Sequence, residues 1–218
     1  MNQTRLAGEQ NMTISGSKVF QETLHARSLR ILGHGKFNNG IIAERLTSYG
    51  SCYVLGACQV QQMSCHGHSS IQYVQARNIV VSGSFAADGV NTDLFEAKGK
   101  VSITGALQAS RVIIWQHGRA SVEDIYAEQS ITIKNDRTSL LSWLSLGGKR
   151  GRFGSLRGRK IEVNDVQAEV IAGEHITIGD NCHVDKVIYS RKLTASPRAV
   201  IGIVEHRPEL ETVWRLEL

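Results

Sequence analysis

The sequence is poor in proline and in aromatic residues. Pro197 and Pro208 are its only prolines in 218 residues, and its aromatic side chains are five Phe, five Tyr and three Trp. Proline has no N–H to donate and is excluded from central β-strands, so the chain is free of such breaks before Pro197. The shortage of large rings agrees with a narrow interior filled by Val, Ile, Leu and Ala.

Long apolar runs and a disulfide framework are also missing. No stretch approaches the roughly 18 consecutive apolar residues that a membrane-spanning helix needs, and residues 1–8 lack the apolar core of a signal peptide. We expect no disulfide framework among the four cysteines, Cys52, Cys58, Cys65 and Cys182. Cys52, Cys58 and Cys65 are expected to be small buried side chains. These features predict a cytoplasmic protein.

Acidic residues are absent from one basic stretch. The formal net charge is +5, and six of the 25 basic residues lie close together without an acid among them: Lys149, Arg150, Arg152, Arg157, Arg159 and Lys160. The excess of positive charge therefore belongs to one segment rather than to the whole surface.

The chain does contain a repeat of short, alternating apolar blocks that end in glycine. The blocks are Ile14 to Gly16, Leu29 to Gly33, Cys52 to Gly56, Ile79 to Gly83 and Val101 to Gly105. Between them an apolar residue precedes alanine by two positions, as in Leu24/Ala26, Phe95/Ala97, Leu107/Ala109, Ile125/Ala127 and Val166/Ala168. Residues i and i+2 share one face of a strand, and only stacked neighbours can bury so narrow an apolar face. The repeat predicts an all-β solenoid of about nine coils with about 19 residues each, a rod on the order of 40 to 45 Å long.

Residues 138–160 interrupt this repeat, which resumes at Ile161. We interpret them as one inserted loop that projects from a coil boundary. One of two open interpretations is that this loop docks on a membrane or a partner. Its apolar residues would enter an anionic membrane interface and its basic residues would bind headgroups; they are Leu141, Trp143, Leu144, Lys149, Arg150, Arg152, Arg157 and Arg159. The alternative is a loop that folds back over the solenoid with solvated arginines. We expect no nucleic-acid partner, because the aromatic residues that stack on bases are scarce among the basic ones, where Phe153 is the only one.

A solenoid leaves strand edges and an apolar interior uncovered at both ends unless capping repeats close them. The sequence shows no obvious capping repeat, and residues 209–218, which alternate polar and apolar side chains, either fold over the last coil or form a loose tail. If the ends stay open, the coils of one copy can stack on those of another, and a contact that does not close on itself builds a filament. The residues predicted to line the two ends are Ile14, Val19 and Phe20 on one side, and Val200, Ile201, Ile203 and Val204 on the other.

The repeat and the stretch from Gly179 to Leu193 resemble the bactofilins, bacterial cytoskeletal proteins that form polymers. The resemblance covers about residues 13–137 and 161–204. It implies a single-domain right-handed parallel β-helix over 13–206, with tails at 1–12 and 207–218. It further implies a non-enzymatic scaffold that assembles end to end without nucleotide or other cofactor. The implied partners are further copies, a paralogous bactofilin, and the inner membrane surface or its proteins, where envelope or motility machinery is organised.

The rival interpretation is an enzyme of the hexapeptide-repeat acyltransferase type, which forms a left-handed coil. Residues 178–183 and 200–202 are similar to fragments of that repeat, and His183 would be its general base. Strict six-residue spacing is absent elsewhere, so we favour the scaffold. Cys65, His66 and His68 contain metal-ligand side chains, but the simpler interpretation is a turn at Gly67. We therefore assign no catalytic, cofactor or metal residue.

Overall fold

The computed structural model describes residues 10–116, 120–135 and 150–209. The strands in this part of the chain are β1 (Asn11–Ile14), β2 (Ser17–Phe20), β3 (Leu24–Ile31), β4 (His34–Phe37), β5 (Ile41–Ser48), β6 (Ser51–Cys65), β7 (His68–Val81), β8 (Ser84–Gln116), β9 (Ser121–Asn135), β10 (Gly151–Val163), β11 (Val166–Ile178), β12 (His183–Ala195) and β13 (Val200–His206).

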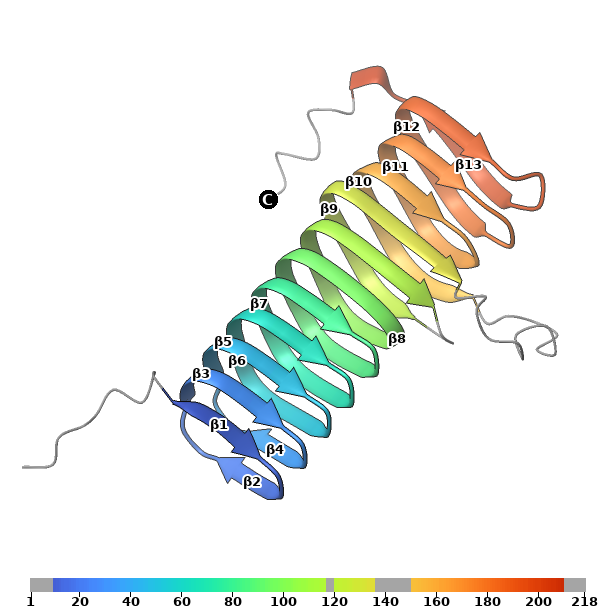
Figure 1. Cartoon of the computed structure of the whole chain (residues 1–218). Coiled ribbons are helices and arrows are strands. Elements are labelled where there is room, and N and C mark those ends of the chain that lie inside the picture. Colours follow the sequence, from blue (N-terminus) through green and yellow to red (C-terminus); the bar gives the residue numbers. More distant parts are fainter. Residues whose placement is uncertain (1–9, 117–119, 136–149, 210–218) are drawn as a thin grey trace, which may run out of the picture.

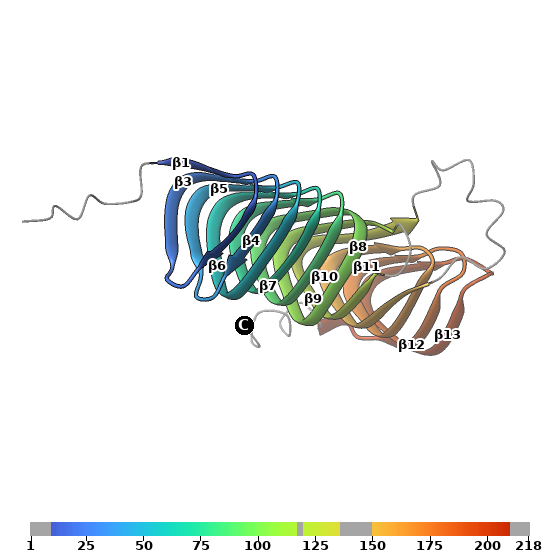
Figure 2. The same cartoon turned by 90° about the horizontal axis from the view of Figure 1, so that it is seen from below.

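The strands stack as a right-handed parallel solenoid of about ten coils, with β1 and β2 at one end and β13 at the other (Figures 1 and 2). Each coil contributes to three faces. Face A begins with β1, which pairs with Ser28–Ile31. Face B begins with β2, which pairs with β4, and face C begins with Leu24–Ala26, which pairs with Ile41–Ala43. This arrangement confirms the predicted all-β parallel solenoid.

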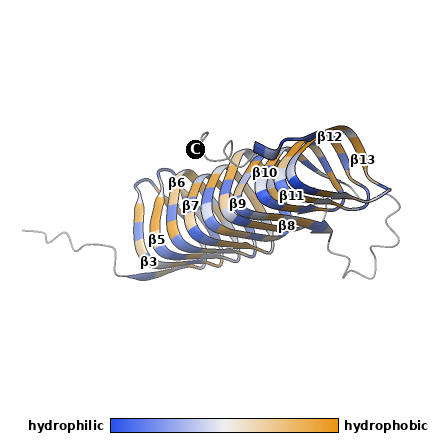
Figure 3. Ribbon diagram, turned by 90° about the horizontal axis from the view of Figure 1, so that it is seen from above, coloured by the Kyte–Doolittle hydropathy of each residue, from blue (hydrophilic) through white to orange (hydrophobic). Residues whose placement is uncertain are grey.

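The bends between faces follow from breaks in the alternation of buried and exposed side chains. In β3, Ala26, Leu29 and Ile31 are buried, so the two-residue period fails between Ala26 and Leu29. The chain bends there from face C to face A, and both faces keep their apolar side chains inward. Figure 3 shows the resulting alternation of polar and apolar positions on coil after coil. The buried side chains form one core cluster along the axis.

Most coils are shorter than the 19 residues predicted, although Ser102 and its partner Ser121 are 19 positions apart. Asn11 pairs with Ser28, 17 positions further on, and Gly151 pairs with Val166, 15 positions further on. The interval rises to 31 only where Ser121 pairs with Arg152, so the extra chain of the predicted inserted loop lies between β9 and β10. Residues 151–160 belong to β10. The predicted boundary of the insertion at residue 160 is therefore wrong.

Glycines stack in a column at the bend between faces A and B. A Cβ on Gly50 would lie 1.9 Å from the Gly33 carbonyl oxygen, and a Cβ on Gly67 would lie 2.1 Å from the Gly50 oxygen. The column consists of Gly16, Gly33, Gly50, Gly67, Gly83 and Gly99. Gly56 and Gly105, which the sequence placed in the same series, instead adjoin the backbone of Asn39 and Asp88 at the bend between faces B and C. The spacing of glycines in the sequence looked uneven because the series combined glycines from two different bends.

We predict that Gly50→Ala lowers the free energy of unfolding by about 1–3 kcal/mol, because its Cβ must push apart two stacked bends. Gly16→Ala is the matched control, since it occupies the same column and its Cβ would meet nothing within 4 Å. Urea unfolding followed by circular dichroism measures both. Equal midpoints for the two variants would contradict the close approach of the bends.

Candidate assembly site at the solenoid ends

The N-terminal end is formed by β1, β2 and Leu24–Ala26, which pair with the next coil on one side only among the described strands. Its inward side chains Met12, Phe20 and Leu24 are partly buried against the core. Phe20 stacks on Phe37 with ring centroids 5.0 Å apart. The end therefore presents half-covered apolar side chains beside unpaired strand edges.

Of the three residues predicted at this end, Phe20 lies on the inward side as expected. Ile14 is only 3% exposed, so the prediction that it lines the end surface is wrong; it is already part of the core. Val19 is 54% exposed, but it pairs with Lys36 at an outward position and so lies on the flank. Lys18 was not predicted, and it occupies the inward position that pairs with the buried Gly35.

The C-terminal end is formed by β13 and the second half of β12. Ile201 pairs with Val184 and Val204 pairs with Val187, which places both side chains in inward columns. Val184 and Val187 are buried, whereas Val204 is 51% exposed, because none of the described strands lies beyond β13. Leu193, which the sequence prediction missed, is a third partly buried inward residue, on face A.

Val200 and Ile203 are highly exposed too, but for another reason. They pair with His183 and Lys186, whose positions face outward, so they lie on the flank of the last coil. The sequence predicted the correct segment but could not separate inward from outward positions, because β13 is apolar at both. The end surface is therefore smaller than the predicted set of seven residues.

Polar contacts hold the last coil on its neighbour. Glu205 binds Lys186 Nζ at 2.6 Å and Arg207 at 2.6 Å, and the hydrogen bond from Lys186 is the main cause that lowers the pKa of Glu205. His206 stacks on Tyr189 at 4.9 Å, and its Nε2 lies 3.0 Å from the carbonyl oxygen of Ser190. These contacts fix β13 in register, so the apolar end keeps a defined shape.

The basic residues do not form one patch. Arg152 lies on face B, Arg157 on face C and Lys160 on face A, because a coil of this length passes around the whole rod. Their surroundings also differ: Arg150 donates to Asn181 Oδ1 at 2.7 Å, Arg157 lies 5.5 Å from the Tyr126 ring and Arg159 binds Glu174 at 3.2 Å. The residues of the predicted basic segment are therefore spread around the rod, an arrangement that we call the girdle. Leu141, Trp143, Leu144 and Lys149 lie outside the described residues.

The residues considered for metal binding point in different directions. Cys65 is buried and its thiol lies 3.1 Å from the Ser69 hydroxyl, whereas His66 stacks on Tyr49 and its Nδ1 lies 2.8 Å from Ser82 Oγ. Within the described ranges, no group of three or more His, Cys, Asp or Glu side chains is arranged to hold a metal ion. The bend at Gly67 separates Cys65 from His68, as a turn at that position predicts.

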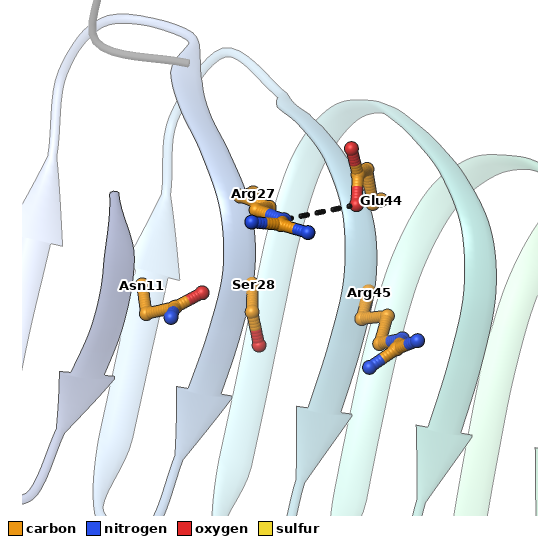
Figure 4. A pocket seen from close by; sticks show the side chains of 5 residues that line it. All are labelled: Asn11, Arg27, Ser28, Glu44 and Arg45. Carbon is orange, nitrogen blue, oxygen red and sulfur yellow. Dashed lines mark ion pairs between the residues drawn. The ribbon is translucent and has the colours of Figure 1, made fainter. Parts of the chain in front are cut away.

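His183, the histidine of the enzyme alternative, is an exposed side chain whose Nε2 lies 3.7 Å from Asp185 Oδ1. A surface depression of about 380 Å³ lies at the other end of the rod, lined by Asn11, Arg27, Ser28, Glu44 and Arg45 (Figure 4). Its Arg27–Glu44 pair, 3.4 Å apart, is well exposed. Small-molecule sites are mostly apolar and enclosed. The chemistry of this depression is that of a solvated polar surface.

The four cysteines are buried and free. Burial is the main cause that raises their pKa values, and it raises the pKa of Cys58 to about 12. Thiols of this kind stay protonated and act as small apolar side chains, as the sequence predicted for Cys52, Cys58 and Cys65.

Above pH 9.0, the ordinary pKa of a thiol, the unfolded chain loses a proton that folded Cys58 keeps until about pH 12. We predict that this thiol lowers the free energy of unfolding by up to about 1.4 kcal/mol per pH unit between those values. Guanidinium unfolding across this pH range tests the slope, with Cys58→Ala as the comparison. Identical slopes for the two proteins would contradict a thiol that stays protonated in the folded state.

No family model, curated protein or solved structure matches the chain. In the part of the chain that the structure describes, no helix has the length and apolar character to cross a membrane.

Proposed function

We propose that this protein is a non-enzymatic scaffold that works by associating with itself through the ends of its solenoid. The observation that supports this most is Val204, a side chain in an inward column that is 51% exposed at the last coil. Exposed apolar residues beside an unpaired strand edge are the usual features of a surface that adds another strand.

The backbone supplies the second part of the contact. The outer edges of β13 and of Lys192–Ala195 have no partner strand among the described residues. A second copy that brings its own edge to this end pairs those N–H and C=O groups and covers Ile201 and Val204 at the same time. Backbone pairing supplies direction, and burial of apolar surface supplies free energy.

The proposal includes the family resemblance: a bacterial cytoskeletal protein of the bactofilin type, assembled without nucleotide and located in the cytoplasm or at the inner face of the membrane. The right-handed coil supports this over the hexapeptide-repeat enzyme, whose coil is left-handed (Figure 1). The intervals of 15 and 17 residues between paired positions also differ from a strict multiple of six.

We predict that Val204→Arg weakens self-association about tenfold or more, because a guanidinium would be buried in the contact without a partner. Ile203→Arg is the matched control, since it adds the same charge one residue away on the flank. Sedimentation velocity without nucleotide measures both, with the 24.0 kDa single chain as the reference. A wild-type protein that stays a single chain at high concentration would contradict the proposed function.

Membrane association is part of the same proposal, through the inserted segment between β9 and β10. The apolar sequence around Trp143 supports it. Arg152 and Arg157 lie on different faces of the rod, so the two do not belong to one lipid-facing surface.

Replacing residues 138–148 with a Gly/Ser linker is expected to abolish co-sedimentation with phosphatidylglycerol vesicles, since the apolar side chains that enter the interface are lost. Arg152→Gln is expected to leave binding within about twofold of wild type, because one cation contributes roughly 1 kcal/mol only when it is near the lipid surface. If the linker variant binds like wild type, or if the wild type does not bind, the membrane proposal is refuted.

A further inference from the structure

Among the described inward side chains, only those of the N-terminal end include a lysine. Lys18 pairs with Gly35, and Phe20 pairs with Phe37, so Lys18 and Phe20 lie on the inward side of the first rung of face B. The Lys18 ammonium lies 5.4 Å from the Phe20 ring centroid. Its aliphatic stem thus covers part of the apolar end while its charge remains at the surface.

No other described residue on the neighbouring rungs of this column carries a charge. The next rungs place Gly35, Cys52, Ser69 and Phe85 at the position that Lys18 occupies, and all four are buried. A cation is tolerated only on the outermost rung, where it reaches water. An inward-pointing charge on an edge strand is one of the ways in which β-proteins prevent another strand from adding.

The C-terminal end has no lysine or arginine among its described inward residues; the one titratable side chain there is His206, which lies in the column of the buried Gly173 and stacks on Tyr189. Leu193, Ile201 and Val204 are apolar and half covered. If the N-terminal end of one copy stacked on the C-terminal end of another, the Lys18 ammonium would be buried against these side chains, and none of the described inward residues is an acid that could receive it. Two N-terminal ends would bring two such ammonium groups together. Both contacts are unfavourable.

We propose that only the C-terminal end joins a second copy, through a two-fold symmetric contact of Ile201, Leu193 and Val204, and that Lys18 keeps the N-terminal end from stacking. This inference rests on the proposed function and limits it. A two-fold contact between identical surfaces closes on itself. The wild-type protein is then a pair of rods joined at their C-terminal ends, and growth into a filament is blocked.

Lys18→Leu tests this by removing the charge and adding apolar surface. The matched control is Lys36→Leu, the same change at an exposed outward position of the next rung, paired with Val19. Sedimentation velocity and negative-stain microscopy are expected to show a particle of twice 24.0 kDa for the wild type and for Lys36→Leu. Lys18→Leu is expected to form fibres, because both of its ends are then adhesive. Lys18→Gln, which adds less apolar surface, is expected to form shorter ones.

The outcomes separate this inference from the proposed function. Wild-type fibres, or a Lys18→Leu protein that stops at the pair like the control, would overturn the inference and leave end-to-end association intact. A wild-type protein that remains a single chain would overturn both. A wild-type pair together with fibres of Lys18→Leu supports both.

Discussion

In-register backbone hydrogen bonding between parallel coils is the constraint on which the rest of this structure depends. Each residue of a coil lies above its counterpart at the spacing of neighbouring strands, roughly 4.8 Å. At the bend between faces A and B this spacing leaves no room for a Cβ, since one on Gly50 or Gly67 would lie about 2 Å from the carbonyl below. The glycine column is thus a consequence of the hydrogen bonding rather than a separate motif.

The same constraint makes the protein a linear stack, in which each coil contacts the coils before and after it. A side chain with a coil on each side is covered, as Val187 is, whereas its counterpart Val204 has a neighbouring coil on one side only among the described residues. Adhesive surface therefore concentrates at the two ends. What occupies the inward positions of the outermost rungs then decides how copies associate, and here one end has Lys18 and the other has Val204.

The fold could be predicted from the sequence because alternation and repetition are local patterns. What could not be predicted is which bend each glycine occupies and which side of a strand each apolar residue occupies. Gly33 and Gly56 look alike in the sequence but lie at different bends. Likewise, Val204 and Ile203 differ only in which side of β13 they occupy.

The basic residues from Arg150 to Lys160 show the limit most clearly. They are neighbours in the sequence, yet they are distributed around the rod because one coil contains only about 15 residues. Lys18 was missed for the opposite reason. A single lysine between apolar residues carries no signal until pairing with Gly35 shows that it faces inward.

Amide hydrogen exchange as a function of protein concentration tests the central claim most directly. The account predicts slow exchange in β6–β11 at every concentration, because these coils are covered on both sides. It also predicts that protection in β13 and in Lys192–Ala195 rises with concentration, while protection in β1 and β2 does not. Protection that rises at the N-terminal coil, or at neither end, would contradict it.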